Sequence, residues 1–261
     1  MARSGEAERP VTRDATYFDH WYADMAASPD RDAIVARTLG LPPELQSTSL
    51  LPWQGIAEVA EALRLPRDGL LADVACGRGG YGIEVARRAG ARLVGVDFSE
   101  VALEQARRSA VRLLPAGRSE FRAGTLVATG LPAAAADGLM CVDAVQFADP
   151  PLAALAEFRR VLAPGARLAV TCWEAAGPPD ERVPERLRAV SLRRDLMAAG
   201  FADVEVQEKP AWREAERRMW QEALAMPAGS DAALESLRAE GRRSLDTFDS
   251  VRRVLATATA P

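Results

Sequence analysis

From Leu70 onward, short apolar runs alternate with amphipathic stretches, and this alternation constrains the fold more than any other feature of the chain. Segments 80–89, 99–112 and 151–162 have helical character, and the apolar runs around them are LLADVA, RLVGVD, EFRAG, GLMCVDAV and RLAVTCW. Strands that alternate with helices form a parallel sheet covered by helices on both faces. The pattern therefore predicts an α/β fold, with a Rossmann-like, doubly wound and mostly parallel sheet.

The C-terminal part adds two strands and an insertion. ERLRAVSLRRDLMAAG (185–200) predicts a helix, and FADVEVQE and VRRVLATATA predict the sixth and seventh strands. We expect the last strand to run antiparallel. Between these strands, residues 210–248 contain two helical stretches separated by MPAGS, which we interpret as a helical cap over the mouth of the sheet.

The N-terminal part predicts helices that precede the sheet. Residues 1–12 lack apolar periodicity and are expected to form a disordered tail. Ser28 and Pro29 supply an N-cap and a first-turn proline for a helix that ends near Gly40. We therefore divide the chain into an N-terminal helical lid (13–66), a core (67–209), the cap (210–248) and the last strand of the core (249–261).

Composition and charge narrow the class of partner. The 261 residues carry a formal charge of −4 and no basic stripe, so a nucleic-acid substrate lacks its usual electrostatic footprint. The N-terminus has no apolar signal core and no apolar run approaches the ~18 residues of a membrane span, so we expect a cytoplasmic protein without a membrane partner. Three scattered cysteines, Cys76, Cys141 and Cys172, favour reduced thiols, and we predict no metal. The oligomeric state is left open.

A glycine turn after the first strand indicates a nucleotide cofactor. Gly77, Gly79 and Gly82 have the G-x-G-x-x-G spacing, and Asp97 follows Gly77 by twenty residues, where an acid accepts the ribose hydroxyls. Asp73, inside the preceding strand, decides between cofactors. A carboxylate there would repel a pyrophosphate and attract the ammonium and sulfonium of S-adenosylmethionine. A nicotinamide-dependent oxidoreductase, a ligand-free turn, and Asp73 as a helix cap are the alternatives.

These stretches together resemble the class I S-adenosylmethionine-dependent methyltransferases, in their small-molecule branch of type 11 and type 25 domains. The resemblance is carried by the order of LLADVACGRGG, VGVDFSEVALEQAR, GLMCVDAVQFADPPLAALAEFRRVLAPGARLAVTCWE and LMAAGFADVEV. It implies S-adenosyl-L-methionine as the cofactor, with contacts from Asp73, Ala75, Gly77, Gly79, Asp97, Phe98, Ser99, Thr125, Leu126, Val142 and Gln146.

The chain departs from the family pattern at two of these positions. Thr125 stands where relatives usually have an acid at the adenine edge. Gln146 stands where many relatives have a histidine after the fourth strand. A catalytic histidine at that place is therefore excluded.

Candidate catalytic and substrate residues come from the lid and the strand ends. His20, the only histidine, is the first candidate base because imidazole titrates near neutrality, although a packed or surface role is the alternative. Asp143 is expected to position substrate or cofactor, or only to end its strand. Three aromatic side chains are expected to line the substrate pocket or to form the apolar face of the lid helix: Tyr17, Trp21 and Tyr22. Trp173, at the mouth end of the fifth strand, is expected to line the pocket. In the cap, Trp212, Met219 and Trp220 have the helical spacing of core residues.

The predicted function is methyl transfer from S-adenosylmethionine to the oxygen, nitrogen or carbon of a small, hydrophobic or aromatic metabolite. Such a transfer is an in-line displacement, so the protein contributes mainly alignment and exclusion of water. Lys209 is the only lysine among 33 basic residues, a bias that favours a bacterial, GC-rich source and specialised metabolism. The alternative is a protein that binds S-adenosylmethionine and assists a cyclisation or rearrangement, or regulates, without methylating.

Overall fold

The computed structural model describes residues 15–227 and 229–261, so the predicted tail over 1–12 lies outside the described residues. The described chain forms one sheet in the spatial order β3-β2-β1-β4-β5-β7-β6. The strands are β1 (Leu70–Val74), β2 (Arg92–Asp97), β3 (Ser119–Ala123), β4 (Ala136–Val142), β5 (Leu162–Ala175), β6 (Ala202–Glu208) and β7 (Val251–Thr259).

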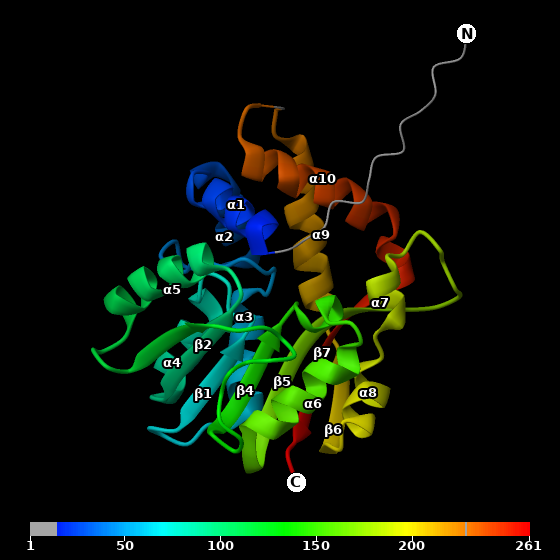
Figure 1. Cartoon of the computed structure of the whole chain (residues 1–261). Coiled ribbons are helices and arrows are strands. Elements are labelled where there is room, and N and C mark those ends of the chain that lie inside the picture. The colour runs from blue at the N-terminus through cyan, green and yellow to red at the C-terminus, as the bar shows by residue number, and fades with distance from the viewer. Residues whose placement is uncertain (1–14, 228) are drawn as a thin grey trace.

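The pairing of the strands confirms the predicted Rossmann-like, doubly wound sheet (Figure 1). β1 lies parallel to β2 and β4, β2 is parallel to β3, and β4 is parallel to β5. Only β7 runs antiparallel, and it pairs with β5 on one side and β6 on the other. The last strand is thus inserted between two strands and does not form the edge.

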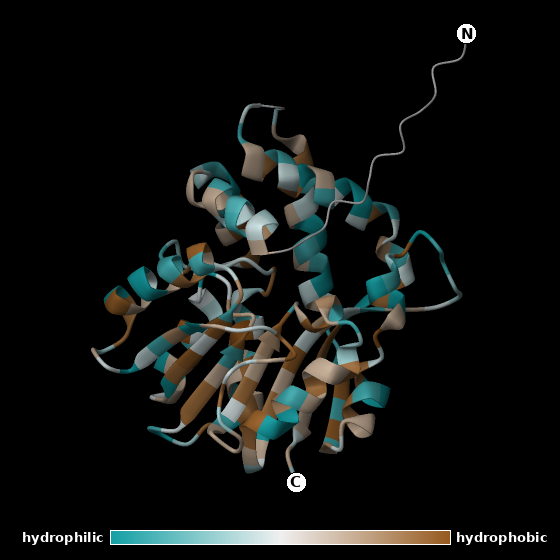
Figure 2. Ribbon diagram, viewed as in Figure 1, coloured by the Kyte–Doolittle hydropathy of each residue, from teal (hydrophilic) through white to brown (hydrophobic). Residues whose placement is uncertain are grey.

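Helices cover both faces of the sheet, as the alternation predicts. On one face lie α3 (Trp53–Leu63), α4 (Gly80–Ala89) and α5 (Glu100–Leu113), and on the other α6 (Pro151–Val161) and α8 (Leu192–Ala198). Within β1, Leu71 packs into the first hydrophobic cluster, and its neighbours Ala72 and Val74 pack into the second. Successive side chains of a strand point to opposite faces, and the central strands β1, β2 and β4 are buried along almost their whole length and largely hydrophobic (Figure 2).

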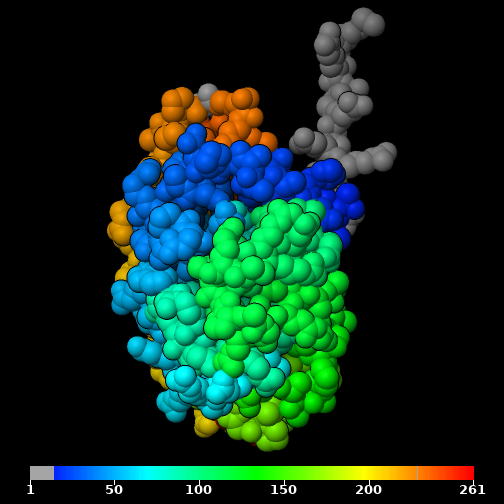
Figure 3. Space-filling model, turned by 90° about the vertical axis from the view of Figure 1, so that its left-hand side faces the viewer, coloured from blue at the N-terminus to red at the C-terminus, as the bar shows by residue number. Residues whose placement is uncertain are grey.

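Four helices gather at one end of the sheet: α1 (Ala15–Ala26), α2 (Pro29–Leu39), α9 (Pro210–Ala225) and α10 (Ala232–Asp246). α2 packs on α9 and α1 on α10, so segments from the two ends of the sequence lie side by side (Figure 3). Trp212, Met219 and Trp220 of α9 are buried in the same hydrophobic cluster as Ile34 of α2. α3, which the sequence grouped with the lid, packs instead against α4, β4 and β5.

The single helix predicted over 185–200 is wrong, because the segment forms two short helices, α7 (Glu185–Ala189) and α8. Val190 between them is extended, with φ −78° and ψ 132°. The backbone N–H of Leu192 donates to the buried Glu174 carboxylate at 2.6 Å, and that of Ser191 donates to Asp195 at 3.0 Å. These side chains capture backbone donors that a continuous helix would use internally.

Candidate active site

A cavity of about 850 Å³ lies at the carboxyl ends of the parallel strands, under α1, α9 and α10. Ligands of open α/β sheets bind at this edge. Its lining includes most of the residues that the sequence assigns to cofactor and substrate: Asp73, Ala75, Asp97, Phe98, Thr125, Leu126, Val142, Gln146, Tyr17, Trp21, Tyr22 and Trp173. Asp143 lines it too, whereas Gly77, Gly79, Ser99 and His20 do not.

Gly77 and Gly79 shape the loop between β1 and α4 without lining the cavity. Gly77 has a φ of +52°, and a Cβ there would lie 2.7 Å from Thr48 Oγ1 and 3.0 Å from Tyr22 Oη. The glycine therefore lets the loop approach residues of the lid closely. Gly82 serves a different purpose, since its Cβ would lie 2.4 Å from Asp73 Oδ2. The absence of a side chain at Gly82 brings the first turn of α4 against the Asp73 carboxylate.

Asp73 and Asp97 form a buried acidic pair at the floor of the cavity. Asp97 accepts the backbone N–H groups of Gly77 at 2.8 Å and Ser99 at 3.0 Å. Burial, and then the charge of Asp97, raise the pKa of Asp73 to about 7. Burial likewise raises the pKa of Asp97. A cation bound between these carboxylates would lower both pKa values, so the pair is suited to a positively charged ligand.

Ser99 acts through the backbone and the lid. Its hydroxyl accepts the N–H of Ala102 at 3.2 Å, which caps α5, and donates to the Asp19 carboxylate at 2.5 Å. Placed outside the cavity lining, it holds the end of β2 and the lid helix α1 together.

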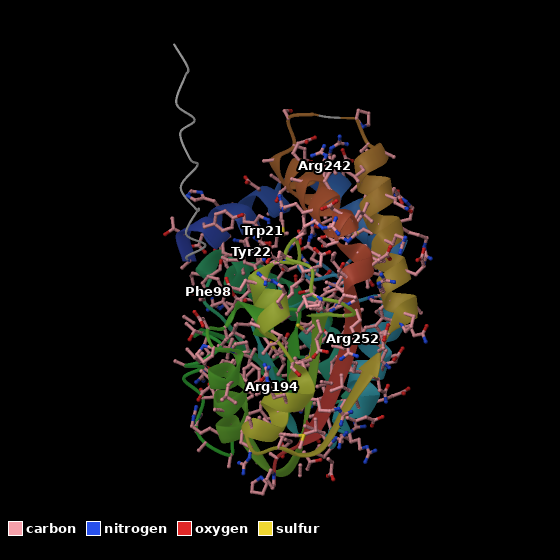
Figure 4. The ribbon with its side chains drawn as sticks, turned by 90° about the vertical axis from the view of Figure 1, so that its right-hand side faces the viewer. Trp21, Tyr22, Phe98, Arg194, Arg242 and Arg252 are labelled. Atoms are coloured by element: carbon pink, nitrogen blue, oxygen red, sulfur yellow. The ribbon has the colours of Figure 1, made fainter. Side chains whose placement is uncertain are left out.

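Aromatic rings of α1 meet Phe98 at the cavity. Phe18 packs edge to face on Phe98, with ring centroids 5.1 Å apart, and on Trp21 at 5.7 Å. Figure 4 shows Trp21 and Tyr22 of the lid helix α1 close to Phe98. Phe18 was not singled out by the sequence, although it belongs to the aromatic run TYFDHWY. Thr125, which also lines the cavity, is exposed, and its hydroxyl accepts the N–H of Ala128 at 3.1 Å.

A buried ion-pair network ties the lid to the glycine loop. Both terminal nitrogens of Arg78 donate to the Asp32 carboxylate, at 2.9 and 2.8 Å, although Arg78 lies inside the glycine motif. Arg31 also donates to Asp32 and to the carbonyls of Ser47 and Thr48. Sequence analysis missed this network, whose one signal is an arginine placed between two glycines.

The position of His20 gives no support to its predicted role as the base. Its side chain is exposed on α1 and does not line the cavity. Tyr17, Phe18, Trp21 and Tyr22 occupy the inner side of the same helix, which leaves His20 on the side that faces water.

Asp143 follows β4 in a left-handed conformation, with φ +57°, and is paired with a buried arginine. Arg253 of β7 contacts Asp143 Oδ1 and Oδ2 at 2.5 and 2.7 Å, and its Nε lies 2.7 Å from Glu216 of α9. The indole N–H of Trp173 donates to Glu216 at 3.0 Å. Asp143 therefore links the core to the cap as well as lining the cavity. Gln146 is held nearby, since its amide donates to the Asp143 carbonyl at 2.7 Å.

Glu216 and Arg253 were not identified from the sequence. Glu216 stands four residues from both Trp212 and Trp220, on the apolar stripe of its helix. Arg253 lies between Val251 and Leu255 on the same face of its strand, because residues two apart point the same way. In both cases the available signal was a charged residue on an apolar face. Such a residue indicates a buried ion pair, because burying a charge requires a partner.

The residues fit S-adenosylmethionine. Two buried carboxylates, both with raised pKa values, face a cavity at the glycine turn, and the loop has the positive φ angles of a close backbone approach. Asp73 would attract the ammonium and sulfonium of the cofactor, and Asp97 would accept its ribose hydroxyls. Among residues 15–227 and 229–261, no three His, Cys, Asp or Glu side chains are grouped as metal ligands. No helix in this part of the chain is long and apolar enough to cross a membrane.

Residues 71–165 match a family model described as a methyltransferase domain. This match assigns a methyltransferase domain to residues 71–165, the segment that contains the glycine loop and both carboxylates of the acidic pair.

Curated relatives are O-methyltransferases of fungi. O-methyltransferase resE of Aspergillus sclerotiorum is 26% identical over 144 residues, which are 51% of this chain and 54% of that protein. O-methyltransferase cnsE of Penicillium expansum is 28% identical over 146 residues, 52% of this chain and 53% of that protein. The chain thus spans little more than half the length of these relatives.

Solved structures share the fold at low identity. Phosphoethanolamine N-methyltransferase 2 of Haemonchus contortus, in complex with S-adenosylmethionine, has a TM-score of 0.74 at 17% identity and covers 94% of this chain and 60% of its own. A [4+2]-cyclase has a TM-score of 0.70 at 23% identity, over 98% of this chain and 99% of its own. At these identities the likeness shows the fold alone.

Proposed function

We propose that the protein transfers a methyl group from S-adenosylmethionine to a small, hydrophobic or aromatic metabolite. The observation that carries this proposal is that the acidic pair Asp73 and Asp97 lines the same cavity as aromatic side chains of the lid, the sheet and the cap. Its volume of about 850 Å³ is near the upper end for ligand pockets, consistent with a cofactor and a second molecule together.

The chain's own residues act mainly by alignment and exclusion of water. S-adenosylmethionine, when bound, supplies a methyl group on a positively charged sulfur. Asp73 and Asp97 orient the two ends of that molecule, and Tyr17, Trp21 and Trp173 hold an apolar acceptor against it. Helices α1, α9 and α10 keep bulk water from the reacting atoms, which favours a displacement that disperses charge.

The test is binding followed by transfer of labelled methyl. S-adenosylhomocysteine should raise the melting temperature by several degrees, and nicotinamide nucleotides should leave it unchanged. Methyl-labelled S-adenosylmethionine should then label at least one member of a panel of aromatic and polyketide-like metabolites, with products identified by mass spectrometry. Stabilisation by NAD or NADP without S-adenosylhomocysteine binding would support the oxidoreductase alternative instead.

A second candidate is a cyclisation or rearrangement that uses the cofactor-bound protein without methyl transfer. It is favoured by the [4+2]-cyclase structure, which matches over 98% of this chain. Under this alternative, an acceptor is converted to an isomer of equal mass and no label is transferred. Mass analysis of the same reaction mixtures separates the two candidates.

The biological setting also stays a proposal. The arginine bias supports a bacterial source and specialised metabolism, whereas the two curated relatives named above are fungal. The absence of nucleic-acid partners and a cytoplasmic location remain predictions from charge and from the N-terminal sequence.

A further inference from the structure

Glu216 is a buried carboxyl group on the wall of the active-site cavity. It lies in the middle of α9, its side chain is 1% exposed, and it lines the same cavity as Asp73 and Val142. Through Arg253 it is connected to Asp143, which follows β4 and lines the cavity as well. The carboxyl group thus faces the cavity from the side of the cap.

Charged and polar groups from several elements face this carboxyl. Arg253 comes from β7, Asp143 from the end of β4, and the Trp173 indole from β5. One guanidinium therefore faces two carboxyl groups.

The two carboxyl groups differ in how many acceptor sites are already used. A carboxylate has about four lone-pair sites. Asp143 uses three of them, because Oδ1 accepts the Thr171 hydroxyl, and Oδ2 accepts Arg253 and the N–H of Leu50. Glu216 uses one, because Oε2 accepts the Trp173 N–H, whereas Oε1 forms an ion pair with Arg253 Nε at 2.7 Å and accepts no hydrogen bond from the described residues. Glu216 thus keeps acceptor capacity for a donor in the cavity.

We propose that Glu216 is the general base of the reaction and accepts the proton of a hydroxyl group on the apolar methyl acceptor, which makes the protein an O-methyltransferase. This inference rests on the proposed function. In the step, the acceptor O–H bond breaks and its proton passes to a Glu216 oxygen. An oxygen lone pair forms the new C–O bond, the C–S bond breaks, and its electron pair remains on sulfur as S-adenosylhomocysteine.

The environment of Glu216 sets the direction of the pH dependence. Burial is the largest influence and raises the pKa of Glu216 to about 8, with Arg253 opposing and Asp143 adding to the rise. The ionised fraction of Glu216 therefore rises with pH and reaches one half at about this value. Activity should increase with pH, reach half of its maximum near pH 8 and level off above about pH 9.

The experiment compares wild type, Glu216→Gln and the control Glu58→Gln. Glu58 of α3 also pairs with a cation, Lys209 at 2.7 Å, and accepts a tryptophan N–H, from Trp212 at 3.2 Å, but it lies outside the cavity lining. The acceptors are phenol, 2-naphthol and estradiol, with 2-naphthylamine as the nitrogen counterpart. Label transfer is measured from pH 6 to pH 9.5, and S-adenosylhomocysteine affinity is measured by calorimetry.

Wild type should convert at least one hydroxyl probe to its methyl ether, with a rate at half of its maximum near pH 8 and a plateau above about pH 9. Glu216→Gln should keep its cofactor affinity and KM within about threefold, lose roughly 10²- to 10⁴-fold in kcat, and lose the plateau. Glu58→Gln should keep both rate and plateau. If Glu216→Gln fails to fold, Glu216→Asp replaces it and should shift the position of the plateau.

Several outcomes would overturn the inference. One is that S-adenosylhomocysteine binds but no hydroxyl probe is methylated. Another is that only the amine or carbon atoms are methylated. A third is that Glu216→Gln keeps the wild-type rate and plateau. If the wild-type protein does not bind S-adenosylhomocysteine, the proposed function itself is overturned.

Discussion

At the scale of single residues, the chemistry of the cofactor half of the cavity depends on the buried acid Asp73. Asp73 is 3% exposed, and a Cβ at Gly82 would lie 2.4 Å from its Oδ2, so the glycine allows the helix to come within contact of the carboxylate. A carboxylate in such surroundings takes up a proton more readily than in water. The ligand-free protein therefore holds Asp73 partly protonated near neutral pH, and a cationic ligand requires the ionised form.

This linkage predicts that S-adenosylhomocysteine binds more tightly as pH rises from 6 to 7.5. With a pKa of about 7 for Asp73, the ionised fraction and hence the affinity should increase by about eightfold over this range. The sign for folding is opposite. The pKa of Asp73 is higher in the folded than in the unfolded protein, so protonated Asp73 favours the folded state at low pH. The free energy of unfolding of the ligand-free protein should therefore decrease as pH rises from about 4 to about 7. Calorimetry at several pH values and thermal melts check the two effects.

Asp73→Asn should weaken binding and remove its pH dependence. Asp68→Asn is the matched control, because Asp68 is an exposed acid that pairs with Arg118 near the other end of β1. An unchanged pH dependence in Asp73→Asn would show that another group titrates on binding.

At the scale of elements, the lid is fastened to the glycine loop by ions and not only by apolar contact. Asp32, near the start of α2, neutralises Arg78 of the loop and also pairs with Arg31 of its own helix, and both arginines are almost fully buried. Breaking a buried pair leaves an uncompensated charge, which costs far more than loss of a surface pair. The order of α2 and that of the cofactor loop are therefore coupled.

Asp32→Asn should loosen both elements together. We expect backbone amides of α2 and of the loop over 76–80 to exchange hydrogen at least about tenfold faster, which corresponds to about 1.4 kcal/mol, and S-adenosylhomocysteine affinity to fall. Hydrogen exchange followed by mass spectrometry measures the first effect and calorimetry the second. Asp30→Asn, on the exposed side of the same first turn, should change neither. Faster exchange confined to α2 would contradict the coupling.

At the scale of the whole molecule, Arg253 joins parts of the chain that lie far apart in sequence. It extends from β7 to Asp143 at the end of β4 and to Glu216 in the cap helix α9, and its side chain is 0% exposed. The last strand thus carries the charge that allows two carboxyl groups to be buried between core and cap.

Arg253→Met should lower the free energy of unfolding by about 3–5 kcal/mol, because both acids lose their counter-charge in a buried place. Urea unfolding at pH 8 measures the change. Arg122→Met is the control, since Arg122 pairs with Glu120 at the exposed edge strand β3, and it should cost less than about 1 kcal/mol. A loss for Arg253→Met as small as that of the control would mean that the network contributes little to folding.

The fold could be predicted almost completely because its signals are local. The apolar runs LLADVA and RLVGVD, the glycine turn at Gly77 and Gly79, and the antiparallel last strand all follow from neighbouring residues or from their order. The break at Val190 could not be predicted, because it depends on Glu174 of a distant strand, which accepts the N–H of Leu192. The position of His20 relative to the cavity could not be predicted from the sequence either. Residue type indicates a base, but only packing decides which side of a helix faces the cavity.

By itself, the sequence determined the class of fold and the place and charge of the cofactor site, since Asp73, Gly77 and Asp97 lie at the ends of adjacent strands in any parallel arrangement of those runs. Tertiary structure alone decided which groups meet at the other half of the cavity. Glu216, Arg253 and Asp143 are separated by tens of residues, and their pairing arises because α9 and β7 are folded against the end of β4. Burial then changes the ionisation of Glu216, a property that depends on its surroundings in space and not on its neighbours in sequence.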